Sequence, residues 1–416
     1  MNKSGKSDIV RKGHRKRKST ARFTYEEFQN IVNHENGFAT EGSMLRIRQQ
    51  LFDYVKNSGG YRLTVDACFE HLMNHYKKLP PDLTSKGEKA AILGTALFIC
   101  EKYKVNDKKV SGTISLLAPL IKPLEWFSVL SPIQNFCTHK AFLYGKLSPA
   151  SRRGLLYGPK KKQLDALQYY LYHGRTLNYF IYDESQPTPI NTNSMEKCRS
   201  LVDLPLYIGG NFSNSTPLSL ACLGGQPSTV LLLLKNGAQT ILKIGNQSPF
   251  TASSQPYTVL VNHLNEIANV TNSSDVSFDS KEIHGRIQRY FEIDRLRNPT
   301  MDRVPNEYLL NRTCRLLICL IYLLRASFRI PIVFSDDEKK IPSSAQAWNS
   351  NGPHKLVLFC RFKQYLPNLD FNVSSLQQLC RLAINKRLFQ IGNLPYGVSE
   401  LGLPKSLRQY VAFERD

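Results

Sequence analysis

Long apolar runs and an apolar leader are missing from this sequence of 416 residues. The longest uninterrupted apolar run, 316–324, has nine residues, whereas a membrane-spanning helix needs about 20. The first basic residues are not followed by the apolar segment of a secretory signal peptide. We therefore expect no membrane association and no secretory signal, and we interpret 316–324 as part of a buried core helix.

Paired cysteines are also lacking. The nine cysteines are odd in number, scattered, and include no Cys-x-x-Cys pair, so nothing indicates a disulfide framework. We expect reduced thiols, several of them packed as small apolar residues. This interpretation places the protein in the cytoplasm, or in the nucleus if its basic residues act as an import signal.

Sequence signatures of catalysis are absent as well. The chain has no Gly-x-x-x-x-Gly-Lys phosphate loop, no Gly-x-Ser-x-Gly elbow and no alternation of strands with helices. Cys68, His71 and His75 have a spacing that can bind zinc, but histidines four residues apart usually mark a polar helix face. We expect no enzyme, no catalytic residue, no metal site and no cofactor.

Positive charge is abundant, with a formal net charge of +22. The first 22 residues hold nine basic side chains and one acidic side chain, so they supply eight of these charges. We interpret 1–23 as a basic, disordered arm. Its alternative roles are a nuclear import signal and an anion-binding arm.

Amphipathic helical spacing dominates the chain after this arm. One stretch shows apolar residues at intervals of three and four: Ala90, Leu93, Ala96, Leu97 and Cys100. Strand-like alternation is sparse throughout. This pattern predicts an all-α fold, with 24–140 as a helical region of unknown type.

A helix–turn–helix pattern of about 33 residues lies in the middle of the chain. Thr216 can cap a first helix, and Pro217 suits its first position. Gly225 permits a tight reversal, and Gly237 ends the second helix in a left-handed conformation. The apolar faces between these residues comprise Leu218, Ala221, Cys222, Val230, Leu233 and Leu234.

This segment resembles an ankyrin repeat, whose consensus has Thr-Pro-Leu-His near its start. Ser219 stands where the family prefers His. A single repeat cannot bury its own apolar face, so neighbouring repeats are expected. The resemblance implies a short, irregular ankyrin-repeat solenoid at 141–270, with its best repeat at 214–245, followed by a helical continuation and connection at 281–370.

Two segments are degenerate matches to parts of such neighbours. The segment 166–174 fits a second helix and its closing glycine, and Gly174 precedes Gly237 by 63 residues, near two repeat lengths. The segment 248–250 fits the start of a following repeat.

A second motif lies near the C-terminus. Ser375 followed three residues later by Gln378 has the form of a capping box, which fixes a helix start, and Gly392 suits its end. One apolar stripe follows at helical spacing: Leu376, Leu379, Cys380, Ala383 and Ile384. By itself, the stripe could also belong to one more buried core helix.

The stripe resembles the Elongin-binding element of SOCS boxes, Leu-x-x-x-Cys-x-x-x-hydrophobic. The residues downstream resemble the cullin-contacting element, with Gly402 in place of its first proline. The resemblance implies a three-helix SOCS box at 371–416. It implies Elongin C contacts by the stripe, and cullin contacts by Leu401, Leu403, Pro404, Leu407 and Tyr410.

Both motifs together are similar to the ankyrin repeat and SOCS box family. The resemblance implies a substrate-recognition adaptor that joins a target, held on the ankyrin region, to Elongin B/C, cullin-5 and a RING-box protein for ubiquitination and degradation. One alternative is an ankyrin scaffold whose SOCS-like tail binds Elongin B/C only. A nucleic-acid-associated protein, driven by the positive charge, is a third, although the chain lacks a nucleic-acid-binding fold.

Overall fold

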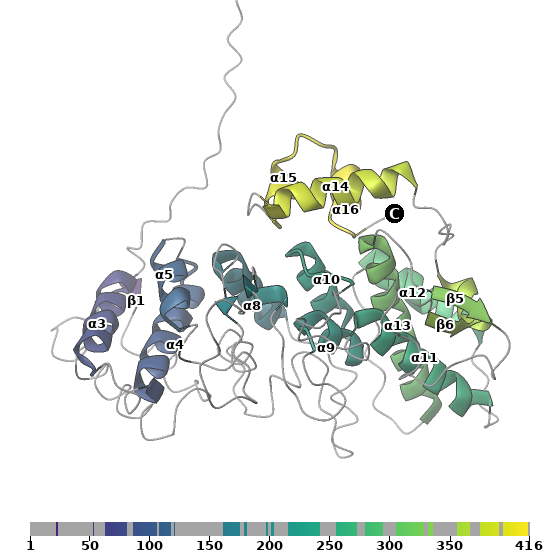
Figure 1. The fold of residues 1–416 in the computed structure, drawn as a ribbon, viewed down its shortest axis with the longest axis horizontal. Coiled ribbons are helices and arrows are strands. Elements are labelled where there is room, and N and C mark those ends of the chain that lie inside the picture. Colours follow the sequence, from purple (N-terminus) through teal and green to yellow (C-terminus); the bar gives the residue numbers. More distant parts are fainter. Residues whose placement is uncertain are drawn as a thin grey trace, which may run out of the picture. The chain divides into compact units, whose positions relative to one another are not determined.

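The computed structural model describes residues 22–23, 53, 63–80, 86–105, 108–117, 120, 161–174, 179–180, 197–198, 201–203, 215–241, 255–272, 279–293, 305–327, 332–335, 356–366, 375–390 and 394–414. They belong to two compact units, Met1–Leu120 and Ile121–Asp416. Helices dominate both units (Figure 1), and the predicted all-α fold is confirmed. Within these ranges, no helix has both the length and the apolarity that a membrane crossing requires.

Three helices of the first unit lie within the described residues. α3 (Val65–Lys78) packs against α4 (Lys86–Lys102), and α4 packs against α5 (Lys108–Leu117). The hydroxyl of Thr64 caps α3 by accepting a hydrogen bond from the Ala67 N–H at 3.2 Å. The described part of the predicted helical region is therefore a set of helices packed in chain order.

The end of the predicted basic arm is not disordered. β1 (Arg22–Phe23) pairs antiparallel with β2 (Leu63–Thr64), directly before α3. Backbone pairing with a distant segment leaves no signal in a short basic sequence, which explains the error. The rest of the arm lies outside the described residues.

The three residues with zinc-like spacing lie on α3. Cys68 is fully buried, and burial raises the pKa of its thiol to about 12. The Nε2 atom of His75 lies 3.6 Å from Oε1 of Glu88, so this side chain faces a carboxylate on α4. A protonated thiol is a poor metal ligand, so these contacts favour a structural role for Cys68.

A tight helical hairpin forms the middle of the second unit. In α9 (Pro217–Leu223), Thr216 Oγ1 accepts a hydrogen bond from the Ser219 N–H at 3.2 Å. The Ser219 hydroxyl also lies 3.0 Å from that of Thr216. Gly225 (φ +57°) turns the chain into α10 (Pro227–Lys235), and Gly237 (φ +89°) follows the end of α10. Both glycines thus occupy the left-handed conformation, which the sequence predicts for Gly237.

A second helical layer stacks on this hairpin. α11 (Pro256–Asn272) packs on α9, α13 (Pro305–Ala326) packs on α10, and α11 and α13 pack on each other. α12 (Ser280–Ile293) lies between them in the chain and packs on α13. First helix stacks on first helix and second on second, which is the arrangement of a helical solenoid.

The neighbours of the hairpin differ from the sequence-based positions. α8 (Lys161–Gly174) contains the predicted segment 166–174, but it lies directly beside α10 (Figure 1) and not two repeats away. The side-chain amides of Gln168 and Asn236 exchange hydrogen bonds of 3.3 and 3.0 Å across this contact. The residues described between α8 and α9 add no stacked helical layer. The predicted start at 248–250 lies outside the described residues.

Short elements fill the connection from α8 to α9. β3 (Tyr179–Phe180) pairs antiparallel with β4 (Lys197–Cys198), and a 3-10 turn, η5 (Leu201–Asp203), packs on α8 and α9. These elements account for part of the 63-residue spacing.

The core of this unit is centred on α13. Every residue of 316–324 is at most 3% exposed, which confirms the predicted core helix. Cys222 and Cys319 pack in the same interior, and burial raises the pKa of both thiols. Buried, protonated thiols are unreactive, so these residues contribute packing and not chemistry.

A small parallel sheet lies within the region expected to be helical, 281–370. β5 (Ile332–Ser335) pairs in parallel with β6 (Leu356–Phe359), and a 3-10 helix, η9 (Cys360–Tyr365), follows. Asn265 of α11 donates to the Val357 carbonyl at 2.9 Å and accepts from the Phe359 N–H at 3.3 Å. This amide attaches the sheet to the helical layers, a contact that short apolar runs do not reveal.

Replacing Gly237 by Ala is expected to lower the free energy of unfolding by about 1–3 kcal/mol. The added Cβ would collide with the ring of Phe389, and the left-handed backbone would be strained. Gly285→Ala is the control, because this helical glycine leaves room for a Cβ, and we expect a gain of about 0.5–1 kcal/mol. Chemical denaturation measures both, and an unchanged Gly237→Ala protein would contradict the contact.

Candidate functional site

The C-terminal helix α14 (Leu376–Gln390) buries a polar face. Gln378, Arg381 and Asn385 are each at most 8% exposed, and Leu388 continues the same face. Their spacing of three, four and three residues places them along one side of the helix. A helix that packed as an ordinary core element would bury its apolar stripe instead.

The buried polar side chains bond to the end of α13. Gln378 Nε2 donates to the carbonyls of Leu324 and Ser327 at 3.1 and 2.9 Å, and Arg381 donates to the carbonyl of Arg325 at 3.3 Å. The last carbonyls of a helix have no partner within that helix. The guanidinium also brings positive charge to the negative end of the helix dipole. The inner face of α14 therefore caps α13.

The same face holds the last helix of the chain, α16 (Lys405–Val411). Asn385 donates to the Val411 carbonyl at 2.8 Å, and the Arg381 guanidinium lies 3.5 Å from the ring centre of Tyr410. Arg325 of α13 donates to the Phe413 carbonyl at 3.3 Å. α13, α14 and α16 are thus joined by cations and amides.

A small apolar cluster completes the C-terminal module, which includes α15 (Gly397–Glu400). The cluster is centred on Leu388, Leu394, Val398 and Val411. Figure 1 shows α14, α15 and α16, in yellow, gathered together. Three short helices therefore share one core of their own.

The predicted Elongin-binding stripe lies mostly on the outer side of α14. Leu376 is 77% exposed, and Cys380 and Ala383 are exposed as well. Leu379 is half-buried, and Ile384 is half-buried against the apolar cluster. The alternative of one more buried core helix is therefore wrong.

Half of the predicted capping box is present. Ser375 Oγ accepts a hydrogen bond from the Gln378 N–H at 3.2 Å. The Gln378 side chain does not complete the box, because it donates to α13. Gly392 lies outside the described residues.

The predicted cullin-contacting residues divide between surface and core. Leu407 is 48% exposed, and Pro404, at the N-cap of α16, is exposed. Leu401, Leu403 and Tyr410 are half-buried and pack on the apolar cluster. Pro404 and Leu407 are thus the most exposed residues of the predicted cullin-contacting set.

Gly402 has the geometry of a proline position. A Cβ at Gly402 would meet nothing within 4 Å. The Leu403 N–H donates to the Leu401 carbonyl at 2.6 Å, which closes a three-residue turn around Gly402. Leu401 has φ −62° and ψ 130°, the extended conformation that a residue before proline requires.

The residues of the ankyrin-like pattern lie mostly in the interior and do not form an exposed surface. Gly237 is half-buried, and the other predicted members are buried: Thr216, Pro217, Leu218, Ala221, Gly225, Val230, Leu233 and Leu234. The structure does not bring them to the C-terminal module, except that Gly237 contacts Phe389.

The positioning roles of Gln378, Arg381 and Asn385 were not predicted from the sequence. A signal was available, because these polar residues recur at helical spacing opposite the apolar stripe. The sequence did not reveal their hydrogen-bond partners, because these lie far away in the chain. The carbonyl of Leu324, for example, lies 54 residues before Gln378.

Comparison with known proteins identifies this module. Residues 372–412 match the family model described as the SOCS box. No curated protein and no solved structure matches the chain. The chain therefore carries a SOCS box, and SOCS boxes in general act as adaptors that bind Elongin B/C in the context of a cullin–RING ubiquitin ligase.

The two sides of α14 should respond differently to truncation. We expect Leu376→Ala to change the free energy of unfolding by no more than about 0.5 kcal/mol, because the side chain is mostly in water. Gln378→Ala should lower it by about 1–3 kcal/mol, because the buried carbonyls of Leu324 and Ser327 each lose a donor. Denaturant titration compares the two, and the reverse order would contradict the assignment of faces.

Proposed function

We propose that this chain is a substrate-recognition adaptor of an Elongin B/C–cullin-5–RING ubiquitin ligase. The observation that carries the proposal is the inverted helix α14, in which polar residues are buried while Leu376 is 77% exposed. An apolar stripe that the chain itself leaves uncovered suits helix-in-groove recognition. Elongin C is the partner that the SOCS box match favours for this stripe.

Leu376 and Cys380 are the proposed centre of the Elongin C contact. Both are exposed and lie four residues apart, one above the other on α14. Leu376 would fill an apolar pocket, whereas Cys380 is small enough to allow close approach. Leu379, Ala383 and Ile384 would complete the contact at its edges.

Target binding is proposed for the stacked helices before the SOCS box. The Thr216 cap, the left-handed Gly225 and Gly237, and the stacking of α9–α10 on α11–α13 support an ankyrin-like solenoid. On this basis we place the chain beside the ankyrin repeat and SOCS box family. The target itself would be an unidentified protein.

Such an adaptor works by position alone. The hydrogen bonds from Gln378 and Arg381 to α13 fix the SOCS box to the proposed target-binding layers. A fixed distance between target and ligase raises the effective concentration of the acceptor lysine near the ubiquitin donor. The proposal therefore requires no catalytic residue and no cofactor in this chain.

Elongin binding tests the proposal directly. We expect the Leu376→Ala, Cys380→Ala double variant to bind Elongin B/C at least about thirtyfold more weakly than the intact chain, because truncating a central apolar anchor costs about 2 kcal/mol. Co-purification and then calorimetric titration measure this loss. Ile241→Ala is the matched control, since Ile241 is an exposed apolar residue outside the SOCS box.

Different outcomes separate the hypotheses. If cullin-5 joins the Elongin complex of the intact chain and both are lost in the double variant, the adaptor proposal stands. Elongin binding without cullin-5 would favour a scaffold that uses its tail for Elongin alone. Equal Elongin binding by the double variant and the control would refute the proposed contact.

Gly402→Pro is expected to strengthen cullin-5 binding about two- to fivefold. The backbone at 401–402 already suits proline, so the substitution removes about 0.4–1 kcal/mol of chain entropy from the unbound turn. Surface plasmon resonance on the Elongin-bound chain measures this change. Elongin affinity serves as the internal control, and weaker cullin binding would show that Gly402 needs its flexibility.

A further inference from the structure

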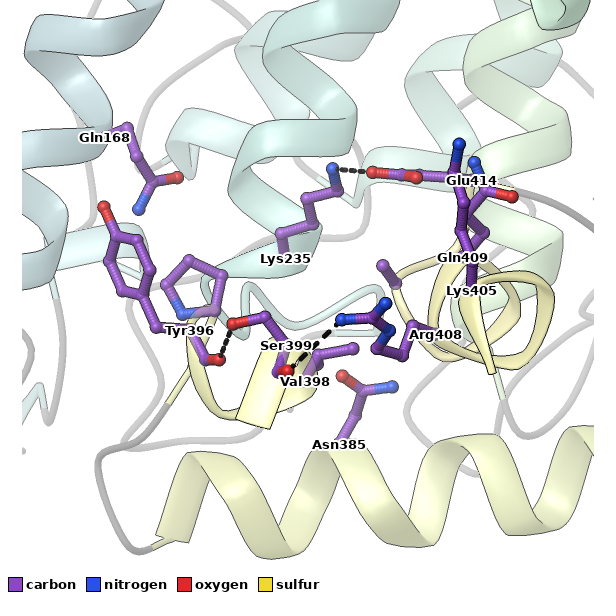
Figure 2. Close-up of a pocket in the computed structure, with 12 residues that line it drawn as sticks. Gln168, Lys235, Asn385, Tyr396, Val398, Ser399, Lys405, Arg408, Gln409 and Glu414 are labelled. Atoms are coloured by element: carbon purple, nitrogen blue, oxygen red, sulfur yellow. Dashed lines mark hydrogen bonds and ion pairs between the residues drawn. The ribbon is translucent and has the colours of Figure 1, made fainter. Parts of the chain in front are cut away.

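A cavity of about 440 Å³ lies between the SOCS box and the helices that precede it. Figure 2 shows side chains of α8, α10, α15 and α16 around it. Its volume is in the range of small-molecule sites, which are about 300–1,000 Å³. The proposed Elongin contact does not use this space, because Leu376 and Cys380 are not among its lining residues.

Positive charge dominates the cavity. Lys235 of α10 and Lys405 and Arg408 of α16 line it, together with one carboxylate, Glu414. Lys235 and Glu414 form an ion pair, drawn as a dashed line in Figure 2. The remaining two cations give the lining a net charge of +2, which matches the dianionic form of a phosphate monoester.

Arg408 has donor capacity left over. The only hydrogen bond of its guanidinium to a described residue is a long one, 3.4 Å from Nη1 to the Ser399 carbonyl. Its Nε is buried, yet it has no hydrogen-bond partner among the described residues. A guanidinium offers five N–H donors in a planar fork, which suits the oxygens of a phosphate.

The opposite wall suits an organic group. Tyr396 is 40% exposed, and its ring meets that of Tyr172 edge to face, with 4.7 Å between centres. The Gln168 amide lies on the same side of the cavity in Figure 2. The aromatic surface can hold the ring of a sugar, and the Gln168 amide, which also bonds to Asn236, has one further N–H for a hydroxyl group.

We propose that this cavity binds a small organic phosphate. The phosphate group contacts Arg408 and Lys405, and the organic group lies against Tyr396. Glu414 opposes binding, because it repels the anion and occupies Lys235. A ligand held in this way joins α16 to Tyr396, which directly precedes α15, and so stabilises the packing of the SOCS box. The inference does not depend on the proposed ligase function.

Calorimetric titration of the full chain with glucose 6-phosphate tests the proposal. We expect saturable binding at one site, weaker binding of inorganic phosphate, and none of glucose. Arg408→Gln should weaken binding at least about tenfold, because charge-assisted hydrogen bonds are lost. Glu414→Gln should tighten it severalfold, and a gain of affinity cannot come from misfolding.

The control addresses the high net charge of the chain. Lys102→Gln removes one exposed positive charge in the first unit, outside the cavity, and should leave the affinity unchanged. If Lys102→Gln and Arg408→Gln weaken binding equally, the phosphate binds the basic surface in general and the proposal fails. Citrate binding as tight as that of glucose 6-phosphate would overturn the assignment to phosphate.

Discussion

The arrangement of the C-terminal half depends on how the last carbonyls of α13 are satisfied. A helix end inside a protein needs donors from elsewhere, and Gln378 and Arg381 of α14 supply them. Because these donors must face inward, the helical period turns Leu376 and Cys380 outward. The exposed apolar stripe is thus a geometric consequence of capping, and the capping face of α14 and its proposed docking face lie on opposite sides of one helix.

Local signals made the helical hairpin predictable. Thr216, Gly225 and Gly237 each act on the backbone within a few residues, so their roles follow from their identity and spacing. The core helix around 316–324 was predictable for a similar reason, because an apolar run between two arginines has few other uses in an all-α chain. The apolar stripe of α14 was also visible, and its exposure followed only from the structure.

The features that the sequence did not reveal depend on distant partners. Leu401 and Tyr410 pack on the apolar cluster, while Leu407 nearby is exposed, and only the fold of the module separates them. The position of α8 beside α10 was misjudged because repeat counting assumes that every 33 residues add a layer. The β5–β6 pair was missed because each strand is four residues long, too short for a pattern.

The side chain of Asn265 makes hydrogen bonds to β6 of the kind that a neighbouring strand would make. Its amide donates to one backbone carbonyl and accepts from the N–H two residues later, so it occupies the hydrogen-bonding edge where another chain would otherwise pair. Aspartate has the same shape but no donor, and leucine has neither donor nor acceptor. Among the described residues, this carboxamide therefore contributes directly to the protection of the edge against intermolecular pairing.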